Sequence, residues 1–336
     1  MWQSFQTFQQ DPVWGLHQTS LEEEASNQQS GKLQVACLST LDLLRVSGAD
    51  AETFLQGQVT CDIKEVAEGG IRLGAHCNAK GRVQASFWAL KTGADFMLVL
   101  PAGQGEPTRA ALGKYAVFSK VTLSIETGLL PLGILGAGAD SLASSCWGDV
   151  PATGQCLQTA RGALANTGST SLLALVPADE AGTLLQSLQD QGATLAGDNP
   201  WWLAQLSAGI AQITAEQSEE WIPQEFNYDL VNGVNFKKGC YKGQEIVARI
   251  HYRGQTKVRA RLFEVSNAPS VAPGTRIVTD AGQNAGTVLQ VAYVKSDTLL
   301  GIGVIKNDIT ESESLRLEPN ESSRVRLIPM PYAITK

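Results

Sequence analysis

One stretch of the sequence is more specific than any other: Lys238-Gly239-Cys240-Tyr241-Lys242-Gly243-Gln244-Glu245, with Arg249 four residues further on. We expect a strand to deliver Cys240 to a turn that is flanked by two glycines. Gly239 and Gly243 are expected there because glycine allows backbone torsions and close approaches that other residues resist. The stretch therefore predicts a tight, cysteine-bearing turn.

A helix is expected to begin near Gln244, directly after this turn. Ile246, Val247 and Ile250 follow helical spacing and would form its buried side. Glu245 and Arg249 stand four residues apart, so they can pair on its surface.

Cys240 is the candidate functional thiol. The N-terminus of the following helix and the ammonium groups of Lys237, Lys238 and Lys242 would favour its thiolate form. Lys238 is the cation assigned to it. The alternative is that Cys240 is a small buried residue in a tight turn, with Gln244 capping the backbone and Glu245–Arg249 acting as a structural ion pair.

The order of β-prone and helical segments predicts an α+β protein. Arg82–Leu90 and Phe96–Leu100 are apolar runs joined by residues with turn chemistry, which indicates a hairpin. Beyond Thr256, short β-prone runs alternate with Gly, Pro, Asn and Asp, which is typical of a small barrel.

Three regions are expected. Residues 1–31 would be a polar leader, either partly disordered or packed on the body. Residues 32–255 would form a body of two interleaved α+β domains with a boundary near 125–130, and residues 256–336 a C-terminal β-barrel. Aromatic side chains could anchor the leader: Trp2, Phe5, Phe8 and Trp14.

Composition excludes several classes of protein. The chain has 43% hydrophobic and 18% charged residues, and it lacks the run of about 20 apolar residues that a membrane helix needs. Its first thirty residues lack the pattern of a secretory signal, so a cytoplasmic protein is expected. Six scattered cysteines without a C-x-x-C pair predict neither a metal site nor a disulfide framework.

A net charge of −7 argues against stable nucleic-acid binding, because such binding relies on Lys and Arg to neutralise phosphates. A local contact with RNA stays open, since eight basic residues crowd between positions 237 and 261. His17, His76 and His251 form no catalytic or metal-binding pattern; His17 lies in the leader, and structural roles are expected for His76 and His251.

The stretch from Lys238 to Glu245, with Arg249, resembles the signature of the YgfZ family, K-G-C-Y-x-G-Q-E followed by an arginine. The likeness runs from about Leu33 to Pro331. It extends more distantly to the aminomethyltransferase, or T-protein, of the glycine cleavage system. Further stretches fit it: Leu55–Asp62, Ala75–Gly81, Lys114–Val121 and Gly286–Val288.

The resemblance implies an α+β fold with three domains in a ring, two of them antiparallel α+β domains and the third a C-terminal β-barrel. It implies binding of folate, as tetrahydrofolate or a derivative. It also implies support for the maturation or repair of iron-sulfur proteins, such as a radical-SAM tRNA-modifying enzyme, and thereby for tRNA modification of the thiomethylation type. The alternative is a folate-dependent one-carbon transferase or demethylase.

One departure from the T-protein concerns catalysis. After the glycine that matches Gly81, those enzymes carry an acidic pair that includes the catalytic aspartate, whereas this chain has Val83-Gln84-Ala85-Ser86. We therefore do not expect aminomethyl transfer.

Folate binding needs an apolar slot for the pterin, a polar group for its edge and a cation for its glutamate tail. Trp202, Glu225 and either Lys238 or Arg249 could fill these roles, and the resemblance adds Asp62. Leu41 stands where family members can carry a second tryptophan. The competing interpretations are that Trp202 is a core aromatic beside Trp201, Glu225 a loop charge or cap, and Asp62 a turn residue.

Overall fold

The computed structural model describes residues 9–11, 15–168, 171–295 and 297–334. Trp2, Phe5, Phe8 and Trp14, expected to anchor the leader, lie outside the described residues. The chain divides into two compact units, each built from separate segments. The first unit comprises Met1–Leu55, Ile63–Arg72 and Phe87–Ala204, and the second comprises Gln56–Asp62, Leu73–Ser86 and Gln205–Lys336.

The described N-terminal residues form regular structure. Strand β1 (Gln9–Asp11) pairs antiparallel with β2 (Gly15–His17), and helix α1 spans Leu21–Gln29. The hydroxyl of Ser20 accepts the N–H of Glu23 and caps this helix. Glu24 is buried and accepts the N–H groups of Gln18 and Gly197, so α1 is fixed to the body of the first unit.

One sheet of the first unit has the strand order β10-β11-β12-β9-β3-β13 among the described residues. Its pairs are antiparallel except β13 with β3, where Thr194 pairs parallel with Gln34. The strands are β3 (Gln34–Cys37), β9 (Leu129–Leu135), β10 (Cys156–Thr159), β11 (Gly162–Asn166), β12 (Ser171–Pro177) and β13 (Thr194–Ala196).

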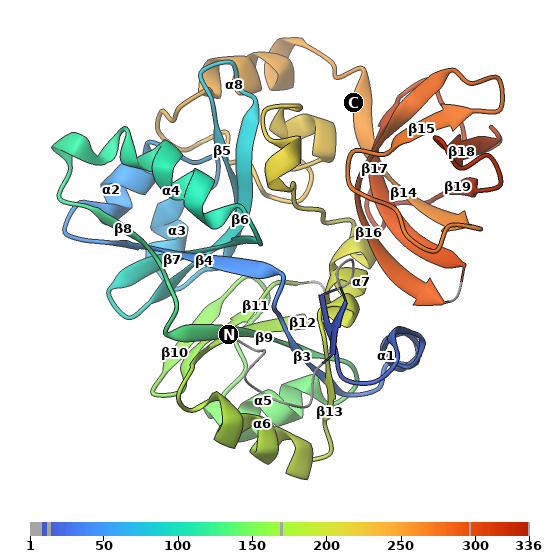
Figure 1. The fold of residues 1–336 in the computed structure, drawn as a ribbon. Helices are drawn as coiled ribbons and strands as arrows, with labels where there is room; N and C mark the ends of the chain where they lie inside the picture. Colours follow the sequence, from blue (N-terminus) through green and yellow to red (C-terminus); the bar gives the residue numbers. More distant parts are fainter. Residues whose placement is uncertain (1–8, 12–14, 169–170, 296, 335–336) are drawn as a thin grey trace. The chain divides into compact units, whose positions relative to one another are not determined.

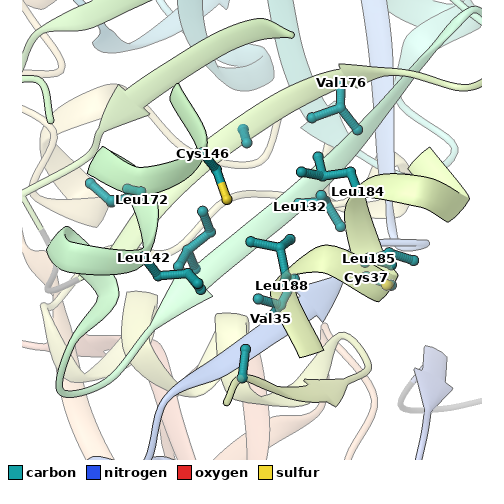
Figure 2. Close-up of a cluster of buried hydrophobic side chains, with 14 of the residues drawn as sticks. Val35, Cys37, Leu132, Leu142, Cys146, Leu172, Val176, Leu184, Leu185 and Leu188 are labelled. Carbon is teal, nitrogen blue, oxygen red and sulfur yellow. The ribbon is translucent and has the colours of Figure 1, made fainter. Parts of the chain in front are cut away.

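Helices α5 (Ala139–Trp147) and α6 (Ala181–Asp190) pack their apolar sides on this sheet. Figure 2 shows Leu184, Leu185 and Leu188 of α6 facing side chains that rise from the strands. Each such leucine is at most 4% exposed, and its burial stabilises the fold by about 1.5–3 kcal/mol.

A second sheet has the order β5-β6-β7-β4-β8 among the described residues. The expected hairpin is confirmed, because β6 and β7 pair from Trp88↔Val99 to Thr92↔Asp95 across a tight turn. The strands are β4 (Leu41–Ser47), β5 (Arg72–Cys77), β6 (Val83–Thr92), β7 (Asp95–Pro101) and β8 (Thr122–Ile125), and the helices between them are α2 (Ala51–Gln56), α3 (Ile63–Ala67), α4 (Gly105–Gly113) and the 3-10 turn η2 (Ala116–Phe118).

The C-terminal part of the second unit is a closed barrel in the order β14-β17-β16-β15-β18-β19, drawn in orange and red in Figure 1. The expected α+β fold with a C-terminal β-barrel is thereby confirmed; the three region boundaries stay predictions. The strands are β14 (Val258–Ser266), β15 (Arg276–Thr279), β16 (Asn284–Lys295), β17 (Thr298–Lys306), β18 (Leu315–Leu317) and β19 (Arg324–Ile328).

Helix α7 (Asn199–Ser207) begins in the first unit, whose last residue is Ala204. The described part of the second unit holds three further helices: the 3-10 turns η3 (Ala215–Gln217) and η4 (Pro223–Phe226), and α8 (Gln244–Arg253). None of the helices in the described part of the chain is long and apolar enough to cross a membrane.

Candidate functional site

The cysteine-bearing turn lies in the second unit, directly before α8. The predicted helix start at Gln244 is confirmed, and Gly243 precedes it with φ +83°. A Cβ atom on Gly243 would lie 2.5 Å from the carbonyl oxygen of Asn78 and 3.1 Å from Cys77 Cβ. Glycine is therefore required at position 243 for both its torsion and the close approach of the Asn78 backbone.

The expectation for Gly239 is wrong. A Cβ atom there would meet no atom within 4 Å, and the φ of Gly239 does not lie in the left-handed region. The difference between the two glycines arises because only Gly243 touches the backbone of another segment.

The expected strand before Cys240 is also wrong, because residues 232–243 are irregular. Asn235 explains why: its side-chain oxygen accepts the N–H groups of Lys237 at 2.8 Å and Lys238 at 3.0 Å. Such side-chain bonds to the following backbone favour a turn over an extended strand. The Asn235 N–H in turn donates to Thr60 O, which fixes the loop to the segment Gln56–Asp62.

Lys238 is buried beneath this turn, with 9% of its surface exposed. Its ammonium donates hydrogen bonds to the carbonyl oxygens of Val59 at 2.7 Å and Cys61 at 2.6 Å, and lies 5.3 Å from the Tyr241 ring centroid. Burial lowers the pKa of Lys238 to about 8, although Cys61 and Asp62 act in the opposite direction. The cation thus ties the turn to Gln56–Asp62.

Asp62 lies at the same junction. Its carboxylate accepts a hydrogen bond from Gln56 Nε2 at 2.9 Å and a longer one from Asn235 Nδ2 at 3.4 Å. The structure therefore brings Asp62, Asn235 and Lys238 together in the second unit. The sequence predicts Asp62 and Lys238 as site residues, but not Asn235.

Cys240 is exposed, whereas the other five cysteines are buried or half-buried. Burial raises the pKa of the Cys77 thiol to about 12 and that of Cys156 to about 11, which disfavours their thiolates. The competing interpretation of Cys240 as a small buried residue is wrong, since its thiol faces solvent. Among the six cysteines, Cys240 is the one that a partner or reagent reaches directly.

Tyr241 and His76 are buried next to the turn in the second unit. The Tyr241 hydroxyl and both His76 ring nitrogens form no hydrogen bond with the described residues. Burial lowers the pKa of His76 to about 3, with Lys242 adding to the shift, so the imidazole is neutral. Burial likewise raises the pKa of Tyr241.

Glu245 and Arg249 are exposed on α8, and no ion pair joins them in the described part of the chain. The expected pairing is therefore wrong. An exposed pair of this kind stabilises a helix by only about 0.3–0.5 kcal/mol, because fixing two flexible side chains costs entropy that offsets the attraction. Val247 is buried as expected, while Ile246 and Ile250 are half-buried.

Glu225 caps the turn η4. One carboxylate oxygen accepts the N–H of Ile222 at 2.9 Å and lies 3.7 Å from the Arg82 guanidinium. Burial raises the pKa of Glu225, opposed by the Ile222 N–H, Arg82 and Arg259. The capping interpretation is confirmed, and a role toward folate stays a prediction.

Trp202 belongs to the first unit, on α7, with 9% of its surface exposed. Its indole N–H donates to the Thr40 hydroxyl at 2.8 Å, and Thr40 directly precedes Leu41. Trp201 beside it is 1% exposed, so both tryptophans are buried, and the burial of Trp202 agrees with its interpretation as a core aromatic.

Asp198, which the sequence did not single out, organises this region. It is fully buried and accepts hydrogen bonds from the N–H of Leu16, the hydroxyl of Ser39 and both the N–H and hydroxyl of Thr40. These bonds oppose the burial that raises the pKa of Asp198. The sequence offered one signal for this role, namely that an acidic residue stands directly before Asn199-Pro200, where a helix begins.

The segment Val83–Ser86, at which the sequence predicted no catalytic carboxylate, is largely buried. Ser86 is buried and its hydroxyl accepts the N–H of Ile213 at 2.9 Å, and Val83 and Ala85 are buried. No group of three or more His, Cys, Asp or Glu residues that could hold a metal ion occurs in the described ranges.

Comparisons with known proteins show which sequences and folds this chain is similar to. The family model described as the GCVT N-terminal domain matches residues 2–164. The tRNA-modifying protein YgfZ of Pectobacterium carotovorum is 33% identical over 301 residues, covering 87% of this chain and 90% of that protein. The protein of the same name from Escherichia coli O45:K1 is 31% identical over 312 residues, covering 88% and 93%.

A solved structure shares the fold. The glycine cleavage system aminomethyltransferase T from Bartonella henselae superimposes with a TM-score of 0.75 at 15% sequence identity, covering 97% of this chain and 94% of that one.

Proposed function

This chain belongs to the family of the tRNA-modifying protein YgfZ, and from that premise we propose that it is a folate-binding accessory protein for tRNA modification. The observation that carries the proposal is the complete signature, Lys238 to Glu245 with Arg249, in a chain that matches these relatives over most of its length.

Folate is the proposed ligand, as tetrahydrofolate or a derivative. The match to the GCVT N-terminal domain and the fold shared with an aminomethyltransferase support it. Trp202 would supply the stacking surface, since a flat indole ring suits a pterin ring. Glu225, Asp62 and Arg249 are the proposed polar and charged partners.

Cys240 is the proposed functional thiol. Its exposure supports this role, because thiol chemistry requires access as well as ionisation. Lys238 is proposed to act on Cys240 by holding the turn, since its ammonium hydrogen bonds go to Val59 and Cys61. Gly243, Tyr241, Gln244 and Glu245 would shape the same turn.

The proposed partners are iron-sulfur proteins, such as a radical-SAM tRNA-modifying enzyme, whose maturation or repair the protein would support in the cytoplasm. In this proposal tRNA is modified by the partner, and the chain itself forms no stable complex with nucleic acid. The net charge of −7 supports that division of labour.

Aminomethyl transfer is not proposed, because Val83–Ser86 offers no carboxylate and Ser86 is engaged with Ile213. Turnover of a methylated or aminomethylated donor by the isolated protein would replace the accessory role with a one-carbon transferase or demethylase.

Calorimetric titration with tetrahydrofolate tests the ligand. We expect saturable binding that Trp202→Phe weakens by at least about fivefold, through loss of stacking area and of the bond to Thr40. Trp147→Phe, in the buried core of the first unit, is the matched control and leaves affinity unchanged. Absence of binding at millimolar ligand rejects the folate proposal.

Complementation tests the thiol. In a bacterial strain that lacks its own relative, Cys240→Ser is expected to abolish rescue of tRNA modification. Cys156→Ser, a half-buried cysteine, is the control and rescues fully. Full rescue by Cys240→Ser rejects a functional role for that thiol.

A further inference from the structure

A cavity of about 350 Å³ lies within the second unit, away from the cysteine-bearing turn. This volume falls within the range of about 300–1,000 Å³ that small-molecule sites occupy. Its lining includes Ile250 and His251 in the last turn of α8 and Arg259 and Arg261 on β14. Helix α8 has ten residues and is about 15 Å long, so the cavity and the Cys240 turn lie at its opposite ends.

The first of the two arginines is neutralised. Arg259 is 9% exposed and donates hydrogen bonds to Asp229 Oδ1 and to the carbonyl oxygen of Gln224, both at 2.7 Å. Asp229 also lines the cavity, and the side chains of this pair are about one-tenth exposed. Their charges cancel, and Arg259 has little freedom to reorient toward a ligand.

The second arginine is not neutralised. Arg261 is half-buried, and its guanidinium forms no hydrogen bond or ion pair with any of the described residues. Residues two apart on a strand share a face, which is why Arg259 and Arg261 reach the same cavity. The cavity wall therefore carries one uncompensated positive charge.

The remaining lining offers both polar and apolar contacts. Gln224 is 1% exposed and uses its amide N–H on Val247 O, while its Oε1 has no hydrogen-bond partner among the residues described. The side-chain amide of Asn307 donates to the carbonyl oxygen of Thr256 at 2.7 Å and so holds the segment between α8 and β14. His251 is kept in place by stacking on Phe236, with ring centroids 3.7 Å apart and planes 14° apart.

We propose that this cavity binds a small molecule through one oxyanion, a carboxylate or a phosphate, that pairs with Arg261. A guanidinium presents two parallel N–H groups and matches both anions in a bidentate manner. A ligand N–H beside the oxyanion would satisfy Gln224 Oε1, and Ile250 and Ile334 accommodate an apolar portion. This site is additional to the proposed folate and thiol functions and does not depend on them.

RNA fits the cavity less well, although eight basic residues crowd between positions 237 and 261. A nucleic-acid surface needs several cations facing successive phosphates. Here Arg259 is already paired with Asp229, and the single remaining charge stands in a cavity that also contains isoleucine side chains.

Nuclear magnetic resonance on the full-length protein, titrated separately with inorganic phosphate and with acetate, tests the proposal. We expect saturable shifts at the amides of Arg261 and Asn307 with at least one probe, and the stronger binder identifies the anionic group. Arg261→Gln should weaken binding at least tenfold. Arg253→Gln, an exposed arginine of α8 outside the lining, is the matched control and should change affinity less than twofold.

Arg261→Lys keeps the charge but loses the bidentate geometry, so it should weaken binding by a smaller factor, and it decides the question if Arg261→Gln does not fold. Absence of saturable shifts with both probes, or equal affinity in the Arg261 variants, overturns the proposal. So does binding of a tRNA transcript that depends on Arg261 while neither small anion binds. Tetrahydrofolate affinity measured on the same variants separates this site from the proposed function, because it should not change.

Discussion

The ammonium of Lys238 lies 2.6 Å from the main-chain carbonyl oxygen of Cys61, a residue 177 positions earlier in the chain. The four-carbon stem of Lys238 thus places its ammonium in the interior, where it donates to the carbonyl oxygens of Val59 and Cys61. An apolar side chain at position 238 would leave these two carbonyl groups without this donor. The signature lysine is in this respect a structural cation.

The first prediction concerns pH and Lys238. Its pKa falls to about 8 on folding, so between pH 8 and about 10.4 the unfolded chain binds the proton more tightly. Burying the ammonium therefore costs stability in full below pH 8, and the cost is relieved as the pH rises. Relative to Lys238→Met, the wild-type free energy of unfolding should rise between pH 7 and 10, by on the order of 2 kcal/mol.

Urea denaturation of both proteins across that range measures this difference, in which the titrations of all other groups largely cancel. Lys237→Met, an exposed neighbour, provides the baseline. A difference between wild type and Lys238→Met that stays flat from pH 7 to 10 contradicts the prediction.

The second prediction separates the two glycines of the signature. Gly243→Ala forces a Cβ atom against Asn78 O at a left-handed torsion, and should lower the free energy of unfolding by roughly 2–4 kcal/mol. Gly239→Ala meets open space and should cost less than about 0.5 kcal/mol. Thermal and urea unfolding measure both; equal costs for the two variants would refute the assignment.

The third prediction concerns thiol accessibility. In the native protein Cys240 should react first with an alkylating reagent, because it is the exposed cysteine and the thiols of Cys37, Cys61, Cys77 and Cys146 are buried. Mass spectrometry should locate one fast-reacting site. Cys240→Ser should remove it and change stability by less than about 0.5 kcal/mol. A fast phase that survives in this variant contradicts the expected exposure.

The fourth prediction concerns Asp198. Asp198→Asn replaces a carboxylate oxygen by an amide that cannot accept, which leaves some of the four donors from Leu16, Ser39 and Thr40 unpaired. We expect a loss of roughly 2–4 kcal/mol in the free energy of unfolding, because each buried donor left unpaired costs about 1–3 kcal/mol. Asp190→Asn, at the exposed end of α6, should change it by less than about 0.5 kcal/mol. A small effect at Asp198 would show that the Leu16 and Thr40 contacts contribute little.

The sequence predicted those features whose causes are local. The hairpin around Thr92–Asp95 follows from alternation and turn residues, and the start of α8 follows from Gly243 before an amphipathic run. The strand expected before Cys240 was wrong because one side chain, that of Asn235, supplies turn-forming bonds that periodicity does not record. Local propensity is overridden where a single polar group satisfies the backbone.

The candidate site was predicted in part. The signature identified Lys238 and Cys240, but the acceptors of Lys238 lie 177 and 179 positions away, and no local pattern reveals them. The same holds for Asp198 with Leu16 and for Arg259 with Asp229, since pairings of this kind depend on how distant segments meet. The functional roles of Trp202, Glu225, Arg249 and Asp62 stay predictions.

The segmented construction of both units has a consequence for synthesis on the ribosome. Strand β3 pairs with β13, Thr194 against Gln34, and the carboxylate that secures Leu16 comes at position 198, so the first unit cannot close until its last helix has been made. Two short pieces of the second unit must wait still longer: Gln56–Asp62 for Asn235 and Lys238, and Leu73–Ser86 for Ile213 and Trp221. The edge of β3 that β13 covers therefore stays unpaired from position 37 to position 194 of the growing chain, and an unpaired strand edge favours aggregation.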